Sequence, residues 1–153
     1  MELKGEQRLP VPQQAAWEAL NDTALLKSAI PGCESITPVD GSPGTYDLVM
    51  IAAVGPVKAK FKGKLELADL DPPNAYTLRF EGNGGVAGFG KGSASVSLAP
   101  VDAANTDLAY TATASVGGKI AQVGSRLVDM AARKIADSFF EKFNAALKER
   151  SGA

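Results

Sequence analysis

The sequence of 153 residues contains no histidine, and this absence excludes several kinds of active site. A Ser-His-Asp triad, a Cys-His pair, an HExxH zinc helix and a two-histidine iron site all need an imidazole. Any catalysis would have to use Asp, Glu, Lys or Tyr side chains, or a bound cofactor. We expect no metal site and no resident cofactor.

Cysteine is nearly absent too, since Cys33 is the only one. A single cysteine excludes an internal disulfide and a cysteine-cluster metal site within the chain. It follows Pro31-Gly32 in a predicted turn, where we expect a buried, unreactive thiol that packs as a small apolar group. A redox or covalent role would require a lowered pKa. A lone cysteine suits a reducing compartment, so we expect a cytoplasmic protein.

Long apolar runs and an excess of one charge are also lacking. No segment approaches the roughly 20 apolar residues of a membrane span, and the charged N-terminus does not resemble a signal peptide. Lys and Arg number 16 against 17 Asp and Glu, which leaves no basic footprint for nucleic acid. The length fits a single domain over residues 1–150, followed by a disordered tail at 151–153.

Alternating apolar residues predict strands over much of the chain. A first strand is expected at 2–11. A short helix follows at 13–20, opened by Pro12, and a second, capped by Asp22 or Thr23, ends near Ala29. Further strands are expected at 35–39, 45–54, 57–67, 76–81, 92–98 and 106–115.

After Gly117-Gly118, apolar residues recur every three or four positions, which predicts one long helix of roughly 45 Å. The stripe consists of Ile120, Val123, Leu127, Met130, Ala131, Ile135, Phe139, Phe143 and Leu147. The predicted fold class is therefore α+β in the order β-α-α-β6-α. In it, a curved antiparallel sheet wraps around the long C-terminal helix and encloses an apolar cavity.

Three segments resemble the G-subunit family of carbon monoxide dehydrogenase, which is part of the START-like (SRPBCC) helix-grip superfamily. They are Ile30-Pro31-Gly32-Cys33-Glu34, Gly90-Lys91-Gly92-Ser93-Ala94, and the stretch from Val116 to Arg126 that opens the long helix. The resemblance implies a helix-grip fold with a deep hydrophobic cavity. It also implies a non-catalytic accessory of a carbon monoxide dehydrogenase-type molybdenum hydroxylase. Such an accessory would bind a hydrophobic small molecule such as a quinone, or would recruit the enzyme to the inner face of the cell membrane.

Candidate ligand contacts follow from the expected cavity. The family places its cavity at the first half of the long helix, while alternation selects inward positions on the strands. The inward strand positions include Phe89, two short-helix residues would close the mouth, and Val86 and Phe89 at the tip of a glycine-rich hairpin would form a gate. The full set is Leu26, Ile30, Met50, Phe61, Leu78, Phe80, Val86, Phe89, Val123, Leu127 and Met130.

The glycine-rich stretch at 85–92 has the spacing of a phosphate-binding P-loop up to Lys91. A P-loop leads into a helix, whereas residues 93–98 alternate as a strand does. We therefore interpret the stretch as a hairpin with sharp turns.

Two other functions remain open on the sequence. An enzyme would need an acid or base in the cavity, for which Glu81, Asp47 and Tyr110 are the candidates. A structural adaptor would instead dock through the alternating Lys58, Lys60, Lys62 and Lys64, which otherwise form a solvated strand face. Lys119 and Arg126 lie either at the surface or at the cavity mouth, where they would grip a carbonyl or carboxylate.

Overall fold

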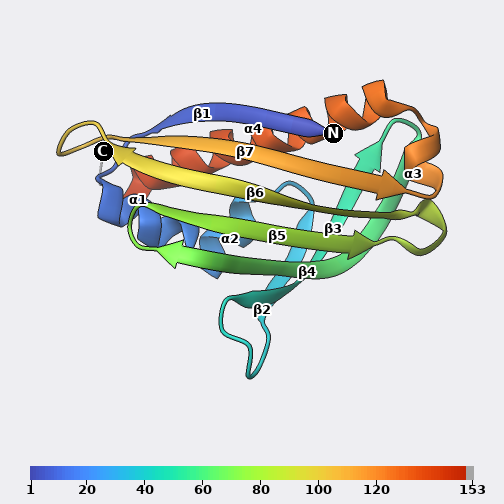
Figure 1. Ribbon diagram of the computed structural model, residues 1–153, viewed down its shortest axis with the longest axis horizontal. Coiled ribbons are helices and arrows are strands. Elements are labelled where there is room, and N and C mark those ends of the chain that lie inside the picture. Colours follow the sequence, from blue (N-terminus) through green and yellow to red (C-terminus); the bar gives the residue numbers. More distant parts are fainter. Residues whose placement is uncertain (151–153) are drawn as a thin grey trace.

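The structure is a computed structural model that describes residues 1–150, and a seven-stranded antiparallel sheet dominates it (Figure 1). The expected tail at 151–153 lies outside the described residues. The strand order is β1-β7-β6-β5-β4-β3-β2. The strands are β1 (Glu2–Leu9), β2 (Cys33–Pro38), β3 (Thr45–Val54), β4 (Val57–Asp71), β5 (Ala75–Asn83), β6 (Phe89–Pro100) and β7 (Thr106–Gly117).

Two short helices connect β1 to β2, as the sequence predicts. They are α1 (Gln13–Leu20) and α2 (Thr23–Ala29). The Asp22 carboxylate accepts hydrogen bonds from the backbone N–H groups of Ala24 and Leu25, at 3.0 and 3.2 Å. Asp22 is therefore the N-cap of α2, because it satisfies donors that have no partner inside the helix.

The long helix is interrupted, which the sequence pattern does not predict. A short α3 (Lys119–Gln122) is followed by α4 (Ser125–Arg150), and Gly124 between them has a φ of 100°. Only glycine adopts such a conformation without strain, so the chain changes direction at this point. The remaining helix still runs along the full length of the sheet (Figure 1).

Strand β6 begins at Phe89, three residues before the predicted start. Pairing with β5 continues through the glycine-rich stretch, since Gly82 lies opposite Gly90 and Asn83 opposite Phe89. The expected hairpin is thus tighter than predicted, and its tip is the short 3-10 helix η1 (Gly85–Ala87).

The main hydrophobic core lies at one end of the sheet, beside α1 and the C-terminal half of α4. Aromatic rings fill much of it. Phe139 packs against Phe140 and Phe143 with ring centroids 5.1 and 5.3 Å apart, and Tyr110 stacks on Phe140 at 5.5 Å. We call this region the closed half.

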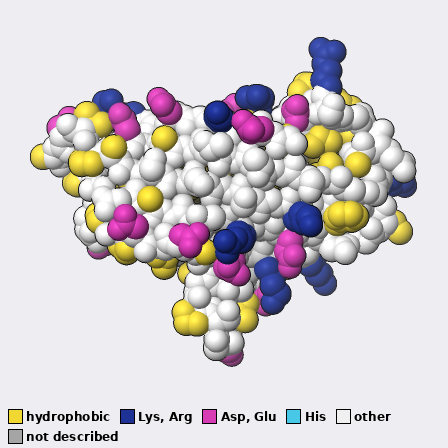
Figure 2. All heavy atoms as spheres, viewed as in Figure 1, with side chains coloured by type: hydrophobic (Ala, Val, Ile, Leu, Met, Phe, Trp, Pro, Cys, Tyr) yellow, Lys and Arg dark blue, Asp and Glu magenta, His cyan; other side chains and the backbone are white. Residues whose placement is uncertain are grey.

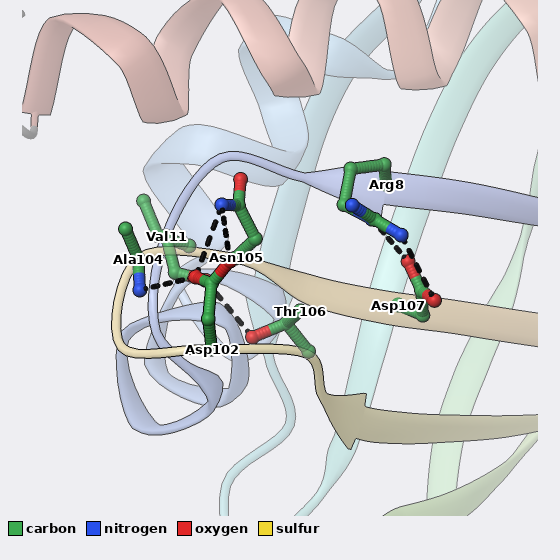
Figure 3. A network of polar contacts seen from close by, with 7 residues as sticks. All are labelled: Arg8, Val11, Asp102, Ala104, Asn105, Thr106 and Asp107. Atoms are coloured by element: carbon green, nitrogen blue, oxygen red, sulfur yellow. Dashed lines mark hydrogen bonds and ion pairs between the residues drawn. The ribbon is translucent and has the colours of Figure 1, made fainter.

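A polar network fastens the same end (Figure 3). The hydroxyl of Thr106, which is fully buried, donates a 2.9 Å hydrogen bond to the carbonyl of Val11. Arg8 forms an ion pair with Asp107 on the neighbouring strand. These contacts join the end of β1 to the start of β7, and so hold the closed half of the sheet together.

Candidate functional site

The inward face of the sheet changes from buried to partly exposed along the strands. In the closed half, inward side chains such as Leu9, Leu98 and Leu108 are buried. Towards α3 the inward positions are apolar but only partly buried, and they include Met50, Ala52, Phe61, Ala112, Ala114 and Val116. The helix therefore covers this part of the sheet less completely than it covers the closed half. We call this region the open half.

Side-chain size along α4 changes in the same direction. The half-buried apolar positions of α4 before Phe139 are Val128, Ala131, Ala132, Ile135 and Ala136, three of them alanine, whereas Phe143 is in the closed half and Phe139 packs against both core clusters. A methyl group fills much less volume than a phenyl ring, so these first turns fill less of the interior than the aromatic turns that follow. We infer that the change in side-chain volume along this helix leaves the open half less filled than the closed half.

Three neighbouring strands carry glycine at the same level of the open half. Gly63, Gly82 and Gly90 are cross-strand partners on the inward face, and we call them the glycine row. A Cβ at Gly82 would meet only the Cβ of Phe61 at 3.8 Å, and one at Gly90 would lie 3.5 Å from Val116. At these two positions the backbone has room for a side chain, and its absence enlarges the hollow.

Loops border the open half at its outer end. Gly55, in the turn between β3 and β4, packs on Leu127. A Cβ at Gly55 would lie 3.0 Å from Cδ1 of Leu127. On the other side Gly88 packs against Gly118 and Ile120, next to η1. The turn, η1 and α3 therefore form one continuous rim around the interior.

The predicted ligand contacts divide into groups. Leu26, Ile30, Leu78 and Phe80 lie together in a second core cluster with Ile36 and Leu65, at the inner wall of the open half. Met50 and Phe61 are cross-strand partners on the inward face beyond that cluster. These six predicted contacts share one side of the sheet, and their contact with a ligand stays a prediction.

Other predicted contacts lie at or outside the rim. Val123 and Leu127 border it, with Leu127 at 36% exposure, while Met130 is 59% exposed. The prediction that Phe89 points inward is wrong, because its register places it on the outward face, paired with Gly117 and next to the inward Gly90. Val86 is 91% exposed at the tip of η1.

The sequence pattern does not select the residues that most clearly create the space. The alanines of α4 and the inward Ala112, Ala114 and Gly82 are small, and a search for bulky ligand contacts passes over them. The signal that could have found them is the shift from alanine to phenylalanine along the last helix, combined with glycines on paired strands.

The three candidate acid–base groups are not brought together. Glu81 and Asp47 are exposed on the outward face, where Asp47 forms an ion pair with Lys64 at 3.8 Å. Tyr110 lies on the inward face, where burial and the negative charge of Asp137 raise its pKa. This arrangement offers no paired acid and base among the described residues of the open half.

Cys33 is half-buried, not buried as expected. Burial raises the pKa of its thiol, which donates to the carbonyl of Ser35 at 3.5 Å. A raised pKa favours the protonated, unreactive form, in agreement with the predicted inert role.

The predicted lysine stripe is a solvent-exposed strand face. Lys60 pairs with Glu34 at 3.0 Å, as Lys64 does with Asp47, while Lys58 and Lys62 are exposed. Lys119 and Arg126 are exposed as well.

Two hollows, of about 890 and 340 Å³, lie across the outward face of the sheet. Charged and hydroxyl side chains such as Lys64, Arg79, Glu81 and Ser93 line the larger one. Its polar, open character is opposite to that of the apolar interior, so we do not assign the lipophilic site to it.

The residues that the structure describes contain no group of three metal-ligating His, Cys, Asp or Glu side chains. Within residues 1–150, no helix combines the length and apolarity required to cross a bilayer.

The curved sheet and the long helix packed across it define the helix-grip class, and similarity to known proteins identifies the family. The family model of the carbon monoxide dehydrogenase G subunit (CoxG) matches residues 5–148, so the chain belongs to that family. No curated protein matches the sequence.

Solved structures agree on the fold. A conserved protein from Geobacillus kaustophilus is 30% identical with a TM-score of 0.89, over 97% of this chain and 96% of the other. The Zhui aromatase/cyclase from Streptomyces sp. R1128 is 13% identical with a TM-score of 0.71, over 99% and 95%. Ara h 8.0201 is 17% identical with a TM-score of 0.69, over 97% and 98%. The last two are similar in fold alone.

Proposed function

We propose that this protein is a non-catalytic accessory of a carbon monoxide dehydrogenase-type molybdenum hydroxylase, and that it holds a lipophilic molecule of the quinone type in its open half. Membership of the CoxG family supports the partner. The observation that carries ligand binding is the partly exposed apolar interior between the sheet and the first turns of α4.

The chemistry of this interior favours an apolar ligand. Each Å² of apolar ligand surface removed from water contributes roughly 25 cal/mol, so even a modest ring and tail bind usefully. Inward positions of the open half are mostly alanine, glycine, valine, leucine, methionine or phenylalanine, and those of β3 to β7 include no Asp, Glu or Lys. Such walls hold a hydrophobic molecule without a group that would act chemically on it.

The outward orientation of the carboxylates supports a binding function over an enzymatic one. Glu81 and Asp47 face solvent, so neither could exchange a proton with a ligand in the open half. The chain shares its fold with an aromatase/cyclase, but neither of these carboxylates faces the interior where a reaction would take place.

Native mass spectrometry of freshly purified protein tests the proposal. We expect a co-purifying lipophile, or uptake of added ubiquinone or menaquinone, in a one-to-one complex. Gly82→Leu should abolish the complex, because its side chain projects into the open half from a position with room for a Cβ. Ser95→Leu, on the outward face of β6, is the matched control and should retain it.

A clean apo mass with no uptake of either quinone would contradict the proposal. Equal uptake by the Gly82→Leu variant would show that the ligand binds elsewhere. Circular dichroism of both variants should match that of the native protein.

A further inference from the structure

The antiparallel sheet has two edge strands, β1 and β2, and they differ in how readily another strand could pair with them. Strand β2 is six residues long, its register shifts between Cys33 and Ser35, and it ends at Pro38, which has no N–H to donate. Strand β1 is eight residues long, contains no proline and keeps one register along β7 from Glu2 to Leu9. None of its inward side chains is charged. Strand β1 is therefore the regular edge, on which another strand could add.

The hydrogen bonds of β1 show which of its backbone groups are directed away from the sheet. The amine of Met1 donates to the carbonyl of Ala114 at 3.0 Å, and the N–H of Ala114 donates to the carbonyl of Met1 at 3.0 Å. Hydrogen-bonded residues alternate in an antiparallel ladder, so the odd-numbered residues of β1 bond to β7. The N–H and C=O groups directed to the free edge belong to the even-numbered residues, which are Glu2, Lys4, Glu6 and Arg8.

The side chains of these four residues alternate in charge along the outward face, in the order negative, positive, negative, positive. All four are exposed, and Figure 2 shows side chains of both charges along the margin of the molecule where Figure 1 places β1. Lys4 Nζ lies 3.8 Å from Glu2 Oε1. Arg8 donates to Asp107 through Nε and Nη2, so Nη1 of the same guanidinium can serve a second carboxylate.

We propose that β1 pairs with β1 of a second copy of this chain, antiparallel and about a twofold axis at Gly5. In this register Glu2 lies opposite Arg8 of the second copy, and Lys4 lies opposite Glu6 of the second copy. Because the axis repeats each pair, every outward charge of β1 meets an opposite charge. Each such pair also exchanges two backbone hydrogen bonds, since these are the residues whose N–H and C=O groups face the free edge.

The order of the charges favours this register over its neighbours. A shift of two residues in one direction places Glu2 opposite Glu6 of the second copy, and Lys4 opposite Lys4. The same shift in the other direction places Lys4 opposite Arg8, and Glu6 opposite Glu6. Like charges directly opposite one another destabilise a strand pair. A shift of one residue would set these residues against residues whose backbone groups already bond to β7. The pattern therefore fits a second copy of β1 in a single register.

The pairing has a consequence for the interior. Strand β1 begins beside Ala114, in the open half, and ends beside Thr106, in the closed half. Antiparallel pairing of two copies therefore places their open halves at opposite ends of one joined sheet. The dimer would present two separate interiors, and the proposal goes beyond the proposed function because it holds whatever ligand they take.

Sedimentation equilibrium of the full chain tests the pairing. One strand pair is a small interface, so we expect a dimer that depends on concentration over roughly 10–500 µM. Glu6→Lys sets two cations opposite each other at both symmetric positions, and Lys4→Glu sets two carboxylates there. Each variant should weaken the dimer by about tenfold. The matched controls are Asp40→Lys, in the turn after β2, and Lys27→Glu, on α2, which are exposed and should dimerise as the native protein does.

Recombined charges distinguish a strand pair from a general effect of charge. The double variant Lys4→Glu, Glu6→Lys exchanges the two charges within one chain, so every outward pair is again of opposite sign and the dimer should return. An equimolar mixture of the two single variants should form a heterodimer tighter than either homodimer, which native mass spectrometry resolves. Both results hold their meaning even where a single variant folds poorly, because they are judged by recovery.

Several outcomes would overturn the pairing. They are a native protein that stays monomeric across this range, single variants that dimerise as their controls do, a double variant without recovery, and a mixture without the heterodimer.

Discussion

At the scale of single residues, absent side chains matter as much as those present. Gly82 and Gly90 have ordinary backbone conformations and room for a Cβ, so sterics do not require glycine there. Gly63 differs, because a Cβ would overlap the carbonyl oxygen of Glu81 on β5. One glycine of the row therefore allows close backbone approach, and two leave space beneath α4.

Alanine substitutions separate these roles. Gly82→Ala should raise the free energy of unfolding of the unliganded protein by about 0.5–1 kcal/mol, because alanine loses less backbone entropy in a strand. Gly63→Ala should lower it, since the new methyl displaces β5. Urea denaturation measures both, and a destabilised Gly82→Ala variant would show that this glycine is structural.

The residue scale is also where sequence-based prediction is least complete. Alternation correctly places Met50, Phe61, Leu78 and Phe80 on one face, because strand geometry is local. It misplaces Phe89, since the inward phase of β6 depends on pairing with β5 across a glycine-rich turn. The glycine row is likewise invisible until strands far apart in the sequence are paired.

At the scale of elements, a strong hydrophobic pattern in the sequence predicts the bounds of a helix or strand well. Strand β3 spans Thr45–Val54 and helix α1 spans Gln13–Leu20, as predicted. The interruption at Gly124 is missed because the apolar stripe continues through it, and a positive φ leaves no trace in periodicity. Likewise, the expected helix of about 30 residues is a shorter α4 preceded by one turn of α3.

The start of α2 offers a pH-dependent test. The hydrogen bond from Arg150 and those from backbone N–H groups lower the pKa of Asp22 in the folded protein. Its contribution to stability is therefore complete above the unfolded pKa of about 3.9, and is lost as the pH falls through the lower folded value.

Asp22→Asn keeps an oxygen that can cap α2 but removes the charge. The stability advantage of the native protein over this variant should be present at neutral pH and should vanish in strong acid. Thermal unfolding across this range measures it. An advantage that is constant with pH would mean that the Asp22–Arg150 ion pair does not contribute.

At the scale of the whole molecule, the two halves of the sheet are packed by different side chains on their inward face. Aromatic rings and the network around Thr106 fill and fasten the closed half. Small side chains leave the open half accessible, and a rim with apolar and basic groups surrounds it. We infer that the closed half supplies stability, which allows the open half to remain unfilled until a ligand occupies it.

Isothermal titration calorimetry with a short-tailed quinone tests this account most directly. The account predicts one-to-one binding with a negative heat-capacity change, the mark of apolar burial. Binding should be lost in Gly82→Leu and kept in Ser95→Leu. Absence of binding to the native protein, or equal binding by both variants, would contradict the claim that the open half holds the ligand.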